Sequence, residues 1–152
     1  MTMTTASTYD RAALRAELLR DEGEKLFAYQ DSVGLWTIGV GHLLGTQPRM
    51  QRITRSESRA LLENDIDLAA GVLSGLIEDW DGLDDVRQRV LLSMAFNLGP
   101  RLAGFVDFLA AVRARRWDAA SAEMLDSKWA KQVGARAQRL AEMMRTGRDG
   151  DS

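Results

Sequence analysis

The chain has 152 residues, of which 45% are hydrophobic and 28% charged, and its net charge is −2. This length and composition predict a globular protein of about one domain and exclude a disordered chain. The sequence contains no cysteine and one histidine, which excludes disulfides and a metal site built from thiolates or several histidines. We therefore expect no metal and no other cofactor.

The N-terminus and the charge distribution bear on where the protein acts. The segment MTMTTASTYD lacks the basic flank and apolar core of a signal peptide, and no apolar run reaches the roughly 20 residues that span a bilayer. We therefore expect the protein to accumulate in the cytoplasm. Residues 101–148 hold 10 basic and 5 acidic side chains. This positive excess either attracts an anionic polymer or belongs to solvated helix faces.

The first predicted element is a helix from about residue 9 or 10 to residue 22. Leu14 and Leu18 recur on one of its faces, and Gly23 supplies the conformational freedom that ends a helix. Glu22 is therefore expected at the C-terminal end of this helix. The helix dipole disfavours a negative charge there, which suits a residue that donates a proton.

Two strands joined by a tight turn are predicted next. The segment LFAYQDSVGLWTIGVGH places β-branched and aromatic residues around the turn sequence DSVG. A turn at residues 32–34 pairs Tyr29 with Thr37 and Asp31 with Leu35.

One face of this hairpin is expected to be unusually poor in packing side chains. Side chains alternate across a strand, so that face carries Asp31, Thr37, Gly39 and Gly41. Glycine weakens a strand unless something approaches its backbone closely, and we interpret this face as the floor of a groove. The opposite face is expected to pack into a small core through Trp36, Ile38 and Val40.

A long helix is predicted from about residue 54 to 78. The sequence TRSE at its start fits a capping box, in which the Thr54 hydroxyl and the Glu57 carboxylate satisfy N–H groups of the first turn. Apolar residues then recur every three or four positions, as on one buried stripe. A further helix is predicted over VRQRVLLSMAFNLG, with Asp85 as the cap and Gly99–Pro100 as the stop. Others are predicted at about 102–114, 118–126 and 134–146. The fold class is α+β and mainly α.

Glu22 and Asp31 are the candidate catalytic pair. Two carboxyl groups that face one gap from different environments suit glycosidic bond hydrolysis, in which one protonates the leaving oxygen and the other organises water. The hydroxyl of Thr37 is placed to hold that water. The same three residue types also occur by chance on solvated surfaces, so the residues alone leave both interpretations open.

The spacing of these residues closely resembles that of the phage-type lysozymes, the endolysins of glycoside hydrolase family 24. Their pattern is Glu-Gly at the end of the first helix, Asp nine residues after the Glu, Thr six further on and a TIGxGH strand. Those positions are Glu22, Asp31, Thr37 and His42 here. The similarity continues through END, FNLG, AGF, RWDAA, SKWAKQ and ARAQR, and covers about residues 14–147.

The resemblance implies a two-lobed lysozyme-like fold within a single domain, with a small N-terminal β-hairpin or sheet. The first lobe is expected at about residues 22–60 and the connecting helix at about 54–78. The helical lobe is expected at about 82–147, together with the helix at 9–22. A saccharide groove is expected between the lobes, and the short segment before the long helix implies a reduced sheet.

The resemblance also implies an activity. It is hydrolysis of the β-1,4 bond between N-acetylmuramic acid and N-acetylglucosamine in bacterial peptidoglycan, with inversion, as a bacteriolytic and antimicrobial step in host lysis by a phage. Glu22 would be the general acid, Asp31 the water-orienting carboxylate and Thr37 its partner. Inversion predicts that the two carboxyl groups are about 6.5–9.5 Å apart, which leaves room for a water.

Three residues match positions that line the saccharide groove in the family, namely Leu43, Phe96 and Gln132. Phe96 fits a core position equally well, because an apolar residue on a buried helix is usually core. Phe108 and Glu123 depart from the family, in which small or amide side chains contact sugar at these positions. The departure leaves the subsite preferences open.

Three further residues have supporting roles in the resemblance. Arg136 matches an arginine that pairs with the catalytic glutamate, although an exposed position on its helix is an equal alternative. His42, alone in the chain, is best interpreted as a structural histidine. Its expected partner is Asp65, in a salt bridge that pins the sheet to the long helix.

The expected partners follow from this activity. They are peptidoglycan as substrate, no nucleic acid, no stable insertion into a membrane, and a monomeric enzyme. A separate holin-type protein would release it from the host cytoplasm to the periplasm and cell wall. Two other functions stay open: a lytic transglycosylase, which would use Glu22 without an activated water, and a non-catalytic wall-binding module.

Overall fold

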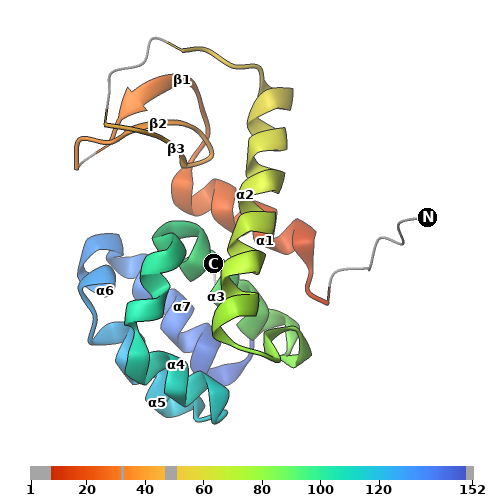
Figure 1. Cartoon of the computed structure of the whole chain (residues 1–152), viewed down its shortest axis with the longest axis vertical. Helices are drawn as coiled ribbons and strands as arrows, with labels where there is room; N and C mark the ends of the chain where they lie inside the picture. Colours follow the sequence, from red (N-terminus) through yellow and green to blue (C-terminus); the bar gives the residue numbers. More distant parts are fainter. Residues whose placement is uncertain (1–7, 32, 47–50, 150–152) are drawn as a thin grey trace. The chain divides into compact units, whose positions relative to one another are not determined.

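The computed structural model describes residues 8–31, 33–46 and 51–149. Ser32, at the expected hairpin turn, lies outside the described residues. The elements in chain order are α1 (Arg11–Glu22), β1 (Lys25–Gln30), β2 (Trp36–Gly39), β3 (His42–Gly45), α2 (Arg55–Leu76), η1 (Trp80–Gly82), α3 (Asp85–Leu98), η2 (Gly99–Gly104), α4 (Val106–Arg113), α5 (Trp117–Leu125), α6 (Lys128–Val133) and α7 (Ala135–Thr146) (Figure 1). The predicted α+β, mainly α fold with a small N-terminal sheet is confirmed.

The chain divides into two compact units. One unit is Ala12–Leu68, and the other joins Met1–Arg11 to Ala69–Ser152. This division groups most of α1 with the sheet, whereas the sequence analysis grouped residues 9–22 with the helical lobe. The assignment of both lobes to a single domain, with a groove between them, stays a prediction.

The sheet has three antiparallel strands in the order β1-β2-β3. The predicted register is confirmed, since Tyr29 pairs with Thr37 and the Asp31 N–H donates to the Leu35 carbonyl at 2.8 Å. The third strand was not predicted. The segment interpreted as one continuous strand turns back after Gly39, and Thr37 pairs with Leu43 on β3.

Two glycines make this second turn. Gly39 and Gly41 have φ values of +65° and +66°, in the left-handed region that glycine adopts without steric cost. The prediction that Gly41 shares a strand face with Thr37 is therefore wrong, because β2 has ended before it. Gly39 also lacks room for a side chain, since an added Cβ would lie 3.1 Å from Oγ of Ser58 on α2. The space left by the missing side chain of Gly39 is taken by Ser58.

The core expected behind the sheet is present in part. Ile38 and Val40 are fully buried, whereas Trp36 is half-buried. The predicted capping box at the start of α2 is confirmed, because Thr54 N–H donates to Glu57 Oε1 at 3.0 Å and Glu57 N–H donates to Thr54 Oγ1 at 3.1 Å. The predicted apolar stripe of this helix is buried at Leu62, Ile66, Ala69 and Leu73.

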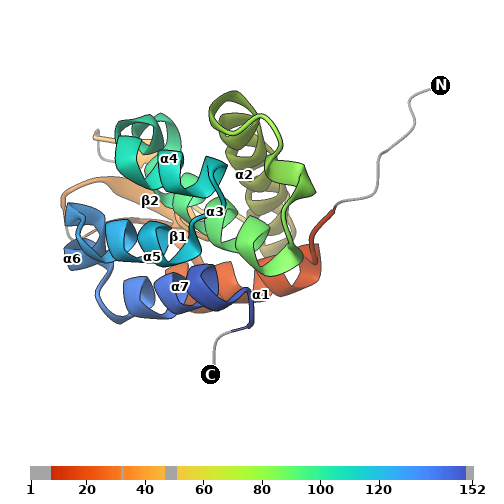
Figure 2. The ribbon, with the colours of Figure 1, turned by 90° about the horizontal axis from the view of Figure 1, so that it is seen from below.

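The second unit is helical, and α3 is its most buried element. Ten of the 14 residues of α3 are buried, including the guanidinium-bearing Arg89. The helix packs against α7, and α7 in turn lies beside α5 in both ribbon views (Figure 1 and Figure 2). Asp84 caps α3 through its side chain, so the prediction of Asp85 as the cap is wrong by one residue. The short helix α6 was not predicted.

Candidate active site

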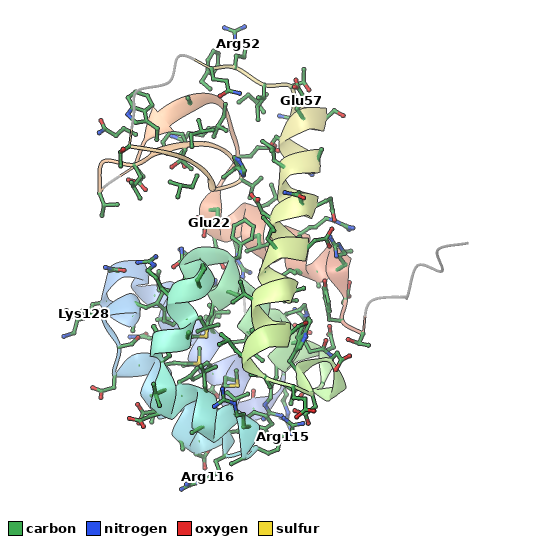
Figure 3. All side chains as sticks on the ribbon, in the orientation of Figure 1. Glu22, Arg52, Glu57, Arg115, Arg116 and Lys128 are labelled. Carbon is green, nitrogen blue, oxygen red and sulfur yellow. The ribbon has the colours of Figure 1, made fainter. Side chains whose placement is uncertain are left out.

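Glu22 lies at the C-terminal end of α1, as predicted (Figure 3). Gly23 ends the helix with φ +72°, and its N–H donates to the Leu19 carbonyl at 2.9 Å. The carboxyl group of Glu22 lies against the turn between β2 and β3. A Cβ added to Gly41 would be 3.0 Å from Glu22 Oε2 and 3.3 Å from its Cδ. The second glycine of the turn thus leaves space for the candidate acid.

Asp31 follows β1 and holds its own turn together. Its Oδ1 accepts hydrogen bonds from the N–H groups of Val33 at 3.0 Å and Leu35 at 2.8 Å. Its backbone carbonyl accepts from Gly34 N–H at 3.1 Å. Both side-chain bonds within the described residues fall on the same oxygen, and they fix the orientation of the carboxylate. The second oxygen, Oδ2, is then the one available to a water.

A row of three side chains crosses the sheet beside these carboxyl groups. Tyr29, Thr37 and Leu43 are paired in register across β1, β2 and β3. Residues directly opposite each other in an antiparallel sheet point to the same face. Thr37 is 6% exposed and its hydroxyl lies 3.4 Å from the Leu35 carbonyl, whereas Leu43 is 57% exposed. The exposure of Leu43, beside the polar side chains of the same row, fits the groove contact expected of it.

Tyr29 connects the two candidate catalytic carboxyl groups electrostatically. Burial raises the pKa of its phenol above the ordinary value of 10.0, and the negative charges of Glu22 and then Asp31 raise it further. The Lys25 ammonium lies over the Tyr29 ring, 4.8 Å from the ring centroid. Sequence reasoning placed Tyr29 in the register but assigned it no role.

A second residue that the sequence analysis missed is Glu24, two positions after Glu22. Its carboxylate accepts from Ser58 Oγ at 2.8 Å and from Arg59 Nε at 2.9 Å, and Arg55 lies 3.4 Å away. The hydrogen bond from Arg59 lowers the pKa of Glu24 the most, with Ser58 and Arg55 adding to it against the opposing effect of burial. Glu24 thereby fastens the start of β1 to the first turn of α2.

His42 and Asp65 form the contact expected between the sheet and the long helix. Nδ1 of His42 lies 2.7 Å from Oδ2 of Asp65, and both side chains are mostly buried. His42 is paired in register with Ile38, so this contact joins β3 and the neighbouring strand to α2. Its position fits the structural interpretation of His42.

The remaining expected site residues belong to the other unit. Phe96 is half-buried on α3, Gln132 is exposed on α6 and Arg136 is half-buried in the first turn of α7. The expected pairing of Arg136 with Glu22 stays a prediction, as does the groove contact of Phe96.

Gln132 lines a pocket of about 440 Å³ that lies wholly within the helical unit. Phe108, 1% exposed, forms part of its apolar wall beside Trp129, and Glu123 adds a carboxyl group. The two residues that depart from the family pattern are therefore at a hollow surface, where they can affect what binds.

Two further features of the described residues concern metal sites and membrane-spanning helices. In residues 8–31, 33–46 and 51–149, no group of three or more histidine, cysteine or acidic side chains is arranged to hold a metal ion. Across the same residues, no helix combines the length and apolar character needed to cross a membrane.

Comparisons with known proteins identify related sequences over most of the chain. The family model described as phage lysozyme matches residues 20–146. Probable T4-type lysozyme 1 of Dictyostelium discoideum is 30% identical over 162 residues, which cover 90% of this chain and 95% of that protein. The pre-baseplate central spike protein Gp5 of Enterobacteria phage T4 is 32% identical over 87% of this chain and 28% of its own length. The endolysin of Salmonella phage P22 is 36% identical over 54% of this chain and 58% of its own length.

Proposed function

Because the chain belongs to the phage lysozyme family, we propose that it cleaves the β-1,4 bond between N-acetylmuramic acid and N-acetylglucosamine in peptidoglycan, with inversion at the anomeric carbon. Membership of this family makes the protein a lysozyme-type glycoside hydrolase, with peptidoglycan as its substrate.

Glu22 is the general acid in this proposal. Its carboxyl group donates a proton to the glycosidic oxygen as the bond from that oxygen to C1 breaks, so the leaving sugar departs as a neutral alcohol. The turn at Gly41 holds the side chain from one side.

Asp31 and Thr37 act on the attacking water. Asp31 Oδ1 is occupied by two backbone N–H groups, and Oδ2 accepts the proton that the water loses as its oxygen bonds to C1. The Thr37 hydroxyl, opposite Tyr29 in the sheet, holds the water in line. Glu22 is left ionised and Asp31 protonated, and exchange with solvent restores both.

The observation that carries this proposal is the position of the two carboxyl groups around β2. Glu22 lies against the turn at Gly41 that follows the strand, and Asp31 bonds the turn that precedes it, with Thr37 on the strand between them. The directions in which both carboxylates shift the pKa of Tyr29, the partner of Thr37 in the sheet register, support the same assignment. Two carboxylates beside a buried threonine and a half-buried phenol are an unusual combination for a solvated surface.

The biological role is a further part of the proposal. The enzyme lyses the host at the end of a phage cycle, as a monomer that waits in the host cytoplasm. A separate membrane-permeabilising protein then gives it access to the periplasm and the wall. The positive excess of residues 101–148 assists its approach to an anionic envelope, and lysis rates should therefore fall as salt is raised.

The test is loss of turbidity of purified cell walls. Glu22→Gln should abolish lysis and Asp31→Asn should lower it by at least about a hundredfold, because each removes a proton-transfer step. Glu142→Gln is the matched control, since Glu142 is an exposed carboxylate that pairs with Arg145 in the next helical turn. Lysis by Glu22→Gln at the wild-type rate would overturn the proposal.

Product analysis separates this reaction from its alternatives. Inverting hydrolysis first yields the α-anomer at the new reducing end, which proton NMR detects before mutarotation. A 1,6-anhydro end would identify a lytic transglycosylase. Binding to walls without release of any fragment would identify a wall-binding module.

A further inference from the structure

The hydroxyl of Tyr29 is a polar group that the catalytic proposal does not use. The residue is half-buried at the β1 end of the sheet row formed with Thr37 and Leu43. Within the described part of the chain, its hydroxyl makes no hydrogen bond, although two carboxylates act on it. Because a half-buried phenol can bond to water, this hydroxyl can exchange that water for an oxygen of a ligand.

Two neighbours of Tyr29 on the strand pair offer acceptors or already use their donor. Asp31 presents a carboxylate, and Thr37 directs its own hydroxyl toward the Leu35 carbonyl. A glycan offers hydroxyl, acetamido and ether oxygens, and it needs donors as well as acceptors to be held in one orientation. The Tyr29 hydroxyl is an uncharged donor that the sheet supplies in the row with Thr37.

The phenol also stays in the form that donates. Burial, followed by the charges of Glu22 and Asp31, raises its pKa above 10.0. The O–H group is therefore retained across the pH range in which a carboxyl acid and a carboxylate act together. The Lys25 ammonium, 4.8 Å from the ring centroid, packs on the ring and limits its rotation.

We propose that Tyr29 is a substrate-binding residue, whose hydroxyl donates a hydrogen bond to an oxygen of the sugar held between Glu22 and Asp31. The inference rests on the proposed function, because it requires a glycan at that site. It adds a binding residue to the site. Tyr29 favours sugars that place an acceptor oxygen over the β1–β2 strand pair. A neutral donor beside two carboxylates also orients the substrate without adding charge.

The experiment measures kcat and KM on soluble, uncrosslinked peptidoglycan strands. Tyr29→Phe keeps the ring and its contact with Lys25 and removes only the hydroxyl. We expect kcat/KM to fall about three- to tenfold, mainly through a higher KM, with an unchanged melting temperature. The chain has one other tyrosine, Tyr9, whose hydroxyl accepts from Arg11 at 3.2 Å. Tyr9→Phe is therefore the matched control and should leave kcat/KM unaltered.

A second measurement does not depend on the stability of the Tyr29→Phe variant. Protein with Tyr9→Phe and Glu22→Gln, grown with 3-fluorotyrosine, carries one fluorine label at Tyr29 and does not consume substrate. Addition of saturating glycan strands should shift the fluorine NMR signal if the phenol meets the sugar. An unshifted signal, or a Tyr29→Phe enzyme with wild-type KM, would overturn the inference.

These outcomes are distinct from failure of the catalytic proposal. If Glu22→Gln retains lysis, the site itself is wrong and the role of Tyr29 falls with it. If Glu22→Gln is inactive and Tyr29→Phe is fully active, the site is right and Tyr29 does not bind the substrate.

Discussion

Substitution of Gly41 by alanine tests whether the turn between β2 and β3 positions the acid. The change adds one methyl group at a residue with φ +66°, where an added Cβ lies 3.0 Å from Glu22 Oε2 and 3.3 Å from its Cδ and Cγ. Left-handed backbone costs alanine about 1 kcal/mol relative to glycine. The close contact adds a second effect, because the Glu22 carboxyl group must move away.

The matched control is Gly23→Ala. Gly23 has φ +72°, and an added Cβ there would meet nothing within 4 Å. Both variants should therefore lose about 1 kcal/mol of stability, equivalent to about 2–4 °C in melting temperature for a chain of this size. Gly23 also adjoins Glu22 in the chain, so a general disturbance of the helix end would appear in this control.

The two variants should differ in activity. A carboxyl group displaced by up to about 1 Å delivers its proton poorly, and such shifts cost up to about a hundredfold in rate. We expect at least a tenfold loss of kcat in Gly41→Ala and less than about a twofold loss in Gly23→Ala, measured as release of reducing ends from soluble strands. Equal losses in the two variants would refute the claim that Gly41 makes room for the acid.

Two other contacts of the sheet give testable expectations. Glu24→Ala leaves the buried hydroxyl of Ser58 without its acceptor and should cost about 2 kcal/mol at pH 7. Because the folded state lowers the Glu24 pKa below 4.5, chiefly through Arg59, this stabilisation is full above that pH. It is lost as the pH falls further, so urea unfolding should show a smaller penalty at pH 3 than at pH 7. Asp65→Asn removes the negative charge that faces His42 and should lower the melting temperature in a thermal scan while wall lysis remains measurable.

Local rules predicted much of the site scaffold from the sequence. The stop at Gly23, the capping box at Thr54 and Glu57, and the Tyr29–Thr37 register each depend on residues a few positions apart. Such signals act through backbone geometry and short-range hydrogen bonds, and they are visible in one stretch of chain.

The errors arose where a local pattern had more than one solution. Alternating residues from Trp36 to His42 fit one longer strand as well as two short strands with a glycine turn between them. The same segment led to the interpretation of Gly39 and Gly41 as a groove floor. Their missing side chains instead make room for Ser58 and Glu22, and a single sequence does not reveal which neighbour occupies such a space.

The roles of Glu24 and Tyr29 were beyond the sequence for a different reason. Glu24 acts through a helix that starts about thirty residues later, and Tyr29 through two carboxyl groups on separate elements. No periodicity or spacing in the sequence predicts either contact. The family pattern added the catalytic positions but assigned no role to these two residues.

Several contacts that bear on the proposed chemistry lie within the Ala12–Leu68 unit. Gly41 positions the acid, backbone N–H groups orient Asp31, and Glu24 holds β1 to α2. The helical unit contributes a separate hollow surface, with Phe108 and Glu123 at its wall. Changes in that pocket should therefore act mainly on KM and on the preferred glycan fragment, because they leave the contacts that set acid and base geometry intact. Changes at Gly41 or Glu24 should act on kcat or on stability. A Glu123 variant that lowered kcat with unaltered KM would contradict this division of labour.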